Sequence, residues 1–353
     1  MTRILIIDDS ALIRKILSNI FAETPDIEVV GTAADPLIAR DKIKKLNPDV
    51  LTLDVEMPRM DGLTFLRNLM RLRPMPVVMI STLTTQGATQ TLKALELGAV
   101  DFLPKPQVGA DKSLQSYADE IIAKVRMAAK AKVRPLSDLP RQNDPPTLTD
   151  STGAGNKTRR SMQASRPKLI ALGASTGGTE AVKVVVRQLL ATSPAMVVSQ
   201  HLPAAFSDSF ARHVDQATAM TACIAGDGQE ILPGNIYIAP GDQHLQVVRQ
   251  GQKFFCHLQD GPPVNRHKPA VDVMFRSVAQ NVGADAIGVL LTGMGADGAK
   301  GMQEMHTAGS ATVVQDESSS VVWGMPGEAY KLGCVDHVLA LDKIAGKIMA
   351  LVG

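Results

Sequence analysis

The chain has 353 residues, 45% of them hydrophobic and 20% charged, and its 37 basic and 35 acidic side chains give a formal net charge of +2. This length exceeds the size at which single hydrophobic cores stop growing, so it favours two domains. The nearly neutral charge creates no long-range field that would attract nucleic acid or an anionic membrane. We therefore expect no nucleic-acid partner. We also expect a monomer.

Targeting and redox signals are absent from the sequence. The three cysteines form no C-x-x-C pair, which indicates neither a disulfide framework nor a zinc site. The N-terminus lacks the apolar core of a signal peptide, and no apolar run approaches the roughly 18 residues of a membrane span. We expect a cytoplasmic protein without direct membrane insertion.

The first 130 residues alternate short apolar runs with amphipathic stretches. Five strands are predicted near residues 4–7, 29–33, 50–54, 77–81 and 100–106, with helices between them and a plausible N-cap at Ser10. Such βα alternation predicts a parallel sheet covered on both faces, with its binding crevice at the carboxyl ends of the strands.

Residues 131–166 change character and are rich in Pro, Ser, Thr, Asn and Arg without an apolar period. This composition predicts a flexible linker between domains of residues 1–130 and 167–353. The linker contains a basic cluster of Lys157, Arg159 and Arg160. Such a cluster could bind an acidic partner, but we favour the interpretation that it is simply solvated.

A second βα alternation follows the linker. Apolar runs at residues 168–175, 195–201, 234–240, 286–293 and 311–316 predict strands of another parallel sheet. Residues 244–259 differ, because two period-two runs flank a Gly-containing turn and predict an antiparallel hairpin.

Carboxylates gather at the predicted strand ends of the first domain. Asp8 and Asp9 close the first strand and Asp54 closes the third, and three adjacent anions require a cation. Oxygen ligands of this kind suit Mg²⁺. Lys105 and Ser81 follow the fifth and fourth strands, so the group predicts attack by a carboxylate on a phosphoryl group.

Residues 1–127 resemble the response-regulator receiver family through these strand-end residues. The resemblance implies that Asp54 is the phospho-acceptor and that Asp8, Asp9 and the carbonyl of Glu56 help to bind Mg²⁺. It also implies that Ser81 reads the phosphoryl group, that Lys105 supplies its counter-charge and that Phe102 is the aromatic switch. In the receiver family Thr is frequent at the position of Ser81 and Tyr at the position of Phe102, and the residues in this chain keep the hydroxyl and the aromatic ring, respectively.

The segment GASTGG (173–178) contains G-x-S-x-G, the pattern of a serine exposed on a tight strand-to-helix turn. Ser175 is the candidate nucleophile, although Gly-rich turns can also cradle phosphate or serve as plain connections. No Gly-Lys-Ser/Thr follows, which weakens the nucleotide alternative.

A serine nucleophile needs a base, and the base needs an orienting carboxylate. His201 is the candidate base, because it ends the next strand, whereas the six other histidines, His267 among them, lack such a placement. Asp297, after another apolar strand, is the candidate carboxylate. As isolated residues, His201 would more often be structural and Asp297 the N-cap of the following helix.

Residues 167–350 resemble the catalytic domain of the chemotaxis protein-glutamate methylesterases (CheB family). The resemblance lies in GASTGG, SQHLP (199–203), IAPGDQHL (238–245), VDVMF (271–275), LTGMGADG (291–298) and WGMPGEA (323–329). It implies that Ser175, His201 and Asp297 hydrolyse receptor glutamyl methyl esters without a cofactor, with Thr176 beside the nucleophile and the Met294 amide as oxyanion donor. Deamidation of receptor glutamines is also implied.

The expected fold is α/β with two doubly wound parallel-sheet domains, a flavodoxin-like receiver and a Rossmann-like esterase domain with an antiparallel hairpin. The expected partners are methyl-accepting chemotaxis receptors as substrate and a chemotaxis histidine kinase as phosphodonor. Two alternatives remain for the second half: a binding module without chemistry, and a serine hydrolase for an unrelated ester.

Overall fold

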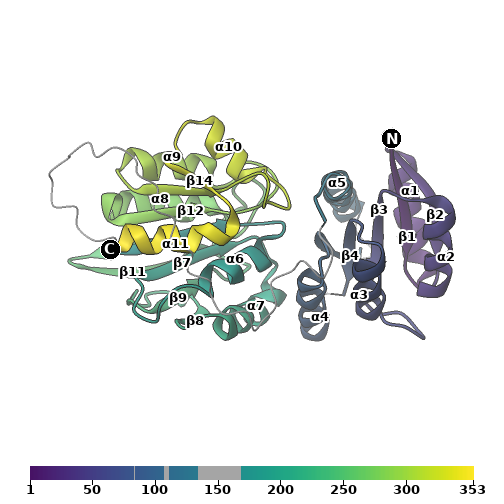
Figure 1. The fold of residues 1–353 in the computed structure, drawn as a ribbon, viewed down its shortest axis with the longest axis horizontal. Coiled ribbons are helices and arrows are strands. Elements are labelled where there is room, and N and C mark those ends of the chain that lie inside the picture. Colours follow the sequence, from purple (N-terminus) through teal and green to yellow (C-terminus); the bar gives the residue numbers. More distant parts are fainter. Residues whose placement is uncertain (83, 107–110, 134–167) are drawn as a thin grey trace.

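The computed structural model describes residues 1–82, 84–106, 111–133 and 168–353. The predicted linker, apart from residues 131–133, and its basic cluster lie outside the described residues. The described residues form two α/β units, one before and one after residues 134–167; the first is purple to blue and the second teal to yellow in Figure 1. Among the described residues, no helix is long and apolar enough to cross a membrane.

The first unit is built on a five-stranded parallel sheet with the order β2-β1-β3-β4-β5, which confirms the predicted flavodoxin-like arrangement. Its strands are β1 (Thr2–Ile7), β2 (Ile27–Ala33), β3 (Val50–Asp54), β4 (Val77–Ser81) and β5 (Asp101–Pro104). The central β3 and β4 are buried along their whole length, as expected for parallel strands covered on both faces.

Five helices cover this sheet, as the alternating pattern predicted. They are α1 (Ala11–Ala22), α2 (Pro36–Leu46), α3 (Gly62–Leu72), α4 (Thr85–Glu96) and α5 (Asp111–Ala128). Ser10 is the N-cap of α1 and accepts a hydrogen bond from the Ile13 N–H at 3.4 Å. Apolar side chains at three and four spacing turn one face of each helix toward the core.

The second unit contains a seven-stranded parallel sheet with the order β14-β13-β12-β6-β7-β9-β8. Its strands are β6 (Leu169–Ala174), β7 (Ala195–Gln200), β8 (Thr221–Ile224), β9 (Asn235–Ile238), β12 (Ala286–Leu290), β13 (Ala311–Gln315) and β14 (His337–Leu339). The edge strands β8 and β14 were not predicted, because three or four half-exposed residues carry too little apolar pattern.

Helices and a separate hairpin surround this sheet. The helices are α6 (Gly178–Val186), α7 (Ala204–Ala217), α8 (Val271–Asn281), α9 (Ala299–Thr307), α10 (Met325–Lys331), α11 (Leu341–Val352) and the 3₁₀ turn η2 (Gly283–Asp285). The predicted hairpin is confirmed as β10 (His244–Gln250) paired antiparallel with β11 (Lys253–Gln259). It lies against α8, whose Ser277 hydroxyl accepts the Val247 N–H at 2.8 Å.

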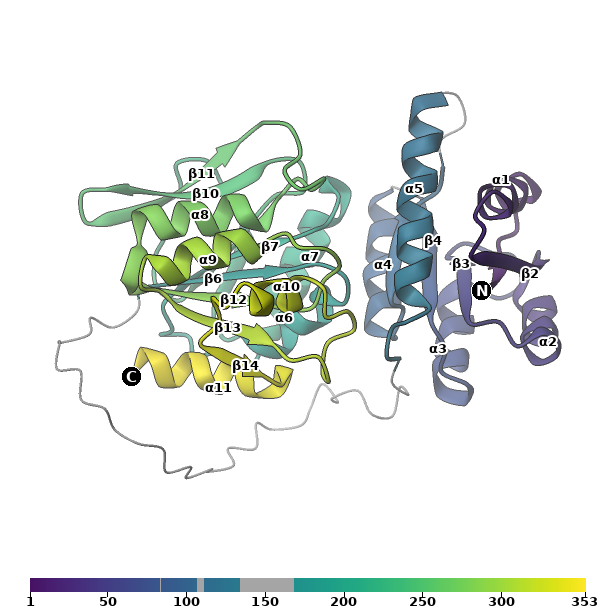
Figure 2. The same ribbon diagram turned by 90° about the horizontal axis from the view of Figure 1, so that it is seen from above.

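The two units are in direct contact through α4 and β5 of the first and α6 and α7 of the second. Figure 2 shows α4 and α5 on the side of the first unit that faces the second. The rings of Phe102 on β5 and Phe206 on α7 lie 4.5 Å apart between centroids. Lys183 on α6 forms an ion pair of 2.6 Å with Glu96 on α4, so the interface contains both an aromatic contact and an ion pair.

We expect Leu172→Ala to destabilise the second unit by about 2–5 kcal/mol, because Leu172 is fully buried in the middle of β6 and its loss leaves a cavity. Urea unfolding measures the change. Leu190→Ala is the matched control, since the Leu190 side chain is exposed and its truncation should alter stability by less than about 0.5 kcal/mol. Equal effects of the two substitutions would contradict this packing.

Candidate active site

Three neighbouring strands bring the predicted serine, histidine and aspartate to one edge of the second sheet. Ser175 follows β6, His201 follows β7, and Asp297 lies in the loop after β12. The order β12-β6-β7 and the in-register pairing of Ala174 with Gln200 place these strand ends side by side. Parallel neighbours end at the same edge, which is why residues far apart in sequence meet here.

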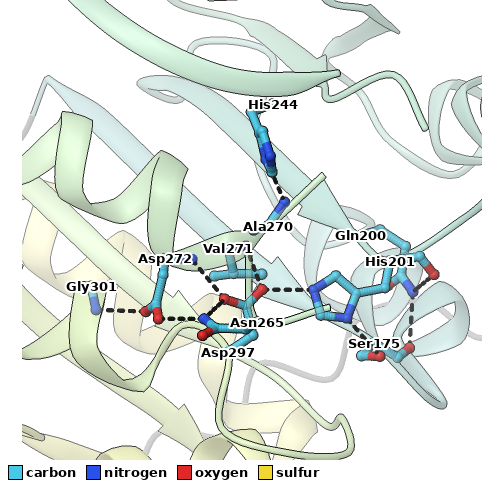
Figure 3. A network of polar contacts seen from close by, with 10 residues as sticks. All are labelled: Ser175, Gln200, His201, His244, Asn265, Ala270, Val271, Asp272, Asp297 and Gly301. Carbon is cyan, nitrogen blue, oxygen red and sulfur yellow. Dashed lines mark hydrogen bonds and ion pairs between the residues drawn. The ribbon is translucent and has the colours of Figure 1, made fainter. Parts of the chain in front are cut away.

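The three side chains form a hydrogen-bonded chain (Figure 3). Nδ1 of His201 lies 3.0 Å from Oγ of Ser175, and Nε2 lies 2.8 Å from Oδ2 of Asp297. An ionised carboxylate can only accept, so the imidazole proton belongs on Nε2 and leaves Nδ1 free to accept from the serine hydroxyl. This is the arrangement of a nucleophile, a general base and an orienting acid.

The Asp297 carboxylate is buried and receives four hydrogen bonds. Besides His201, its donors are the Val271 N–H at 2.6 Å, the Asp272 N–H at 3.1 Å and the Asn265 side-chain amide at 2.7 Å. Burial raises the pKa of Asp297, but the bonds from His201, Asn265 and Val271 outweigh it and lower that pKa overall. Asp297 is therefore held as a carboxylate.

Asp297 is not the N-cap of the helix that follows it, which was the alternative for this residue. The N-cap of α9 is Gly298, and no side chain caps that position. Instead, Asp297 accepts from the first two N–H groups of α8, where Ala270, the N-cap, has no side-chain oxygen to offer. The positive end of the α8 dipole therefore stabilises the negative charge of the Asp297 carboxylate.

The turn that carries Ser175 is shaped by two glycines. Gly177 precedes α6 with φ 74°, a conformation that L side chains rarely adopt. At Gly293 an added Cβ would lie 2.8 Å from Cβ of Ser175, so only glycine allows the chain after β12 to pass this closely. Gln200 fixes the turn from β7, because its side-chain amide donates to the Ser175 carbonyl at 2.9 Å.

Met294, the implied oxyanion donor, and Thr176, the implied neighbour of the nucleophile, line a cavity of about 490 Å³ together with Ser175 and His201. Residues of β5 and α5 in the first unit line the same cavity. The Thr176 hydroxyl donates to the Asp101 carboxylate of β5 at 2.5 Å. The first unit therefore contacts the residue next to the candidate nucleophile.

Four residues of this site were missed from the sequence: Gln200, Asn265, His267 and Asp272. The His267 ring stacks on His201 with centroids 3.7 Å apart and planes 13° apart, although it ends no strand. Asp272 lies in the first turn of α8 and accepts the Gly301 N–H of α9 at 2.7 Å. Gln200 and Asp272 lie within the segments SQHLP (199–203) and VDVMF (271–275) that carry the family resemblance, whereas Asn265 and His267 lie outside all of those segments.

The carboxylates of Asp8, Asp9 and Asp54 meet at the edge of the first sheet, with one oxygen of each within 4.8 Å of the others. Oδ2 of the buried Asp8 has no hydrogen-bond partner, although Nζ of Lys105 lies 3.6 Å away. Nζ of Lys105 binds Oδ2 of Asp54 at 2.7 Å. The unsatisfied oxygen and the all-oxygen donor set fit a hard divalent cation.

The remaining predicted residues of the first unit lie around this cluster. The exposed Glu56 directs its N–H to Asp54 at 3.3 Å. The Ser81 hydroxyl is buried and donates to the Thr82 carbonyl at 3.2 Å. Phe102 lies at the interface on Phe206 and not at the acidic cluster, so it links the two units.

Comparison with known proteins agrees with the family resemblance predicted for each half of the chain. Residues 170–348 match the sequence family described as CheB methylesterase, and residues 4–117 match the response regulator receiver domain. The chain is 57% identical over 349 residues to "Protein-glutamate methylesterase/protein-glutamine glutaminase 2" of Xanthomonas oryzae pv. oryzae (strain MAFF 311018), covering 99% of this chain and 97% of that protein.

A second relative and a solved structure extend this similarity. The "Protein-glutamate methylesterase/protein-glutamine glutaminase" of Hydrogenovibrio crunogenus is 53% identical over 370 residues, with 99% of this chain and 98% of that protein covered. The crystal structure of the Thermotoga maritima CheB methylesterase catalytic domain superposes with a TM-score of 0.52 at 36% identity. The superposition covers 52% of this chain and 98% of the Thermotoga maritima chain.

The acidic cluster makes stability depend on pH when no divalent cation is present. Burial raises the pKa of Asp54 to about 6, despite the bond from Lys105. The folded chain then binds the Asp54 proton more tightly than the unfolded chain, so stability falls as pH rises from about 4 through about 6.

We therefore expect Asp54→Asn to become more stable than wild type by about 1–3 kcal/mol between pH 4 and pH 7 in EDTA. Urea unfolding of the first unit at several pH values measures the difference. Glu23→Gln, at an exposed carboxylate, should show no such trend. A stability difference that does not change with pH would contradict the prediction.

Proposed function

Because this chain belongs to the CheB methylesterase family, we propose that it hydrolyses glutamyl methyl esters on methyl-accepting chemotaxis receptors, releases methanol and deamidates specific receptor glutamines. The observation that carries the proposal is the hydrogen-bonded chain from Ser175 through His201 to the buried Asp297. The receiver domain implies that phosphorylation controls this activity, and the overall role is adaptation in chemotaxis signalling.

Acylation begins when Oγ of Ser175 attacks the carbonyl carbon of the ester and Nδ1 of His201 takes the serine proton. The imidazolium that forms keeps its Nε2–H bond to Asp297, which stabilises the charge. The proton on Nδ1 then passes to the departing methoxide, so methanol leaves and a glutamyl ester of Ser175 remains. For a glutamine side chain the leaving group is ammonia.

Deacylation repeats the same steps with water. Nδ1 of His201 accepts a proton from water, the hydroxide oxygen attacks the acyl carbon, and the proton returns to Oγ of Ser175 as the glutamate is released. The Met294 N–H is the proposed donor to the oxyanion, because Met294 lines the same cavity as Ser175 and Thr176. Each donor of this kind lowers the barrier by about 3–4 kcal/mol.

In the receiver domain we assign Asp54 as the residue that a chemotaxis histidine kinase phosphorylates. Asp8, Asp9, Asp54 and the Glu56 carbonyl would hold Mg²⁺, which supplies positive charge to the phosphoryl oxygens. Lys105 already bonds to the Asp54 carboxylate and would offset the charge of the phosphoryl group. Ser81, at the end of β4, would bind a phosphoryl oxygen through its hydroxyl.

Regulation follows from the contacts of β5 with the catalytic domain. The Asp101 carboxylate binds Thr176 beside the nucleophile, and Phe102, the proposed switch residue, packs on Phe206. In this arrangement the receiver covers the cavity that contains Ser175. Lys105, which directly follows β5, binds Asp54. Phosphorylation of Asp54 would therefore act on β5 and favour a population in which the cavity is open to a receptor.

We expect Ser175→Ala to abolish methanol release from methylated receptor membranes, by a factor of about 10⁴ or more, because the nucleophile is lost. A methanol assay with a small phosphodonor and Mg²⁺ measures this. Ser318→Ala, at an exposed serine after β13, is the control and should keep full activity. Unchanged methanol release by Ser175→Ala would contradict the assignment, and hydrolysis of small esters without receptor demethylation would favour a different substrate.

We expect Asp101→Ala to raise the activity of the unphosphorylated chain several-fold, because it removes the carboxylate that binds Thr176 across the interface. Activity after phosphorylation should stay within about twofold of wild type, since the open state lacks this bond. Asp26→Ala removes an exposed ion pair with Arg126 and is the matched control. A lower or unchanged basal rate in Asp101→Ala would contradict the regulatory contact.

A further inference from the structure

The short turn at residues 264–267, ahead of α8, touches two members of the triad. Val264 and His267 exchange N–H···O=C bonds of 3.0 and 2.9 Å, which closes a two-residue hairpin turn. The central residues Asn265 and Arg266 have φ of 52° and 71°. Both are in the left-handed region, which Asn tolerates and Arg rarely adopts, and such conformations gather at functional sites.

Asn265 bridges two buried carboxylates with its side-chain amide. Nδ2 donates to Oδ2 of Asp272 and to Oδ1 of Asp297, both at 2.7 Å (Figure 3). Asp272 and Asp297 are only 3% and 2% exposed, whereas Asn265 itself is exposed. The Asn265 side chain therefore contributes little to core packing, and both N–H groups of its amide donate to the carboxylates of Asp272 and Asp297.

This bridge matters because neighbouring carboxylates repel each other in a buried site. Burial, the largest cause, and the charge of Asp297 raise the pKa of Asp272, while the bonds from Gly301 and Asn265 lower it. A neutral group with two N–H donors holds both acids without adding a charge that would compete with His201. It also fixes the rotation of the Asp297 carboxylate, so that Oδ2 faces Nε2 of His201.

The other arm of the turn is the His267 ring, which lies flat on His201. Asp297, Lys124 and Arg266 are the further charged groups whose fields reach this ring. Burial and the adjacent His201 lower the pKa of His267 to about 4. At neutral pH the stacked ring is thus uncharged and restricts the His201 imidazole without contributing charge.

We propose that the 264–267 turn is the positioning clamp of the esterase triad, in which Asn265 orients the Asp297 carboxylate and His267 holds the plane of the His201 ring. The inference rests on the proposed function of that triad. Neither residue takes part in a bond-making step. Both act through the geometry of a neighbour, where small displacements change the rate strongly.

The test of the first arm is Asn265→Gly in the full chain, since glycine accepts the left-handed conformation and removes only the amide. With a small phosphodonor and Mg²⁺ present, we expect kcat for receptor demethylation to fall about 10- to 100-fold while KM changes less than about twofold. The downfield proton resonance of the His201 Nε2–H should weaken or move. Asn47→Gly, at another left-handed asparagine in the receiver, is the matched control and should match wild type.

Asn265→Asp gives a readout that a purely structural role would not produce. It keeps the size of the side chain but adds a negative charge beside Asp297, which favours the imidazolium. The acid limb of the kcat profile should move to higher pH. An unmoved limb together with wild-type kcat in Asn265→Gly would overturn the role of Asn265.

The second arm is tested by His267→Ala and His267→Phe. Alanine removes the stacked ring and should lower kcat about tenfold, whereas phenylalanine retains a flat ring and should restore activity to within about threefold of wild type. Equal loss in both variants would overturn the stacking role.

Failure of the clamp can be told from failure of the proposed function. Reaction of Ser175 with a fluorophosphonate probe and methanol release are first measured on the wild-type chain. If wild type shows neither, the esterase assignment is overturned. If wild type shows both and the Asn265 and His267 variants match it in rate, pH profile and proton resonance, the clamp is overturned and the esterase stands.

Discussion

The catalytic domain depends on an exchange of carboxylates between two helices. Asp297, just before α9, accepts the first two N–H groups of α8, and Asp272, in the first turn of α8, accepts an N–H of α9. Each helix thereby receives from its neighbour the acceptor that its own N-cap lacks. The acid that orients His201 is at the same time part of the packing of α8 on α9, so the site and the fold share one interaction.

A second constraint joins the domains. Asp101 and Phe102 are consecutive on β5, and successive side chains of a strand point to opposite faces. One binds Thr176 in the catalytic turn, and the other packs on Phe206 of α7. Lys105 follows on the same strand end and binds Asp54. A single short strand therefore connects the acidic cluster of the receiver with the catalytic edge of the other domain.

The sequence predicts the parts of the site that end strands, because parallel neighbours bring their carboxyl ends together whatever their separation in the chain. Asp8, Asp54, Ser175 and His201 were found by this rule. The strand-end rule could not identify Asn265 and His267, because their turn ends no strand of the sheet and has no periodic pattern. Tertiary packing alone brings this turn to the triad. The edge strands β8 and β14 were missed for a related reason, as their few residues are half exposed.

The orientation of the His201 ring reflects the spacing of the sheet. Adjacent parallel strands lie only about 4.8 Å apart, so the nitrogen nearer to the backbone, Nδ1, suffices to reach the serine on the next strand. The farther nitrogen, Nε2, then extends past β6 toward the loop after β12. The imidazole therefore bridges Ser175 and Asp297 across the edge of the sheet, and the strand order determines which ring nitrogen faces the serine.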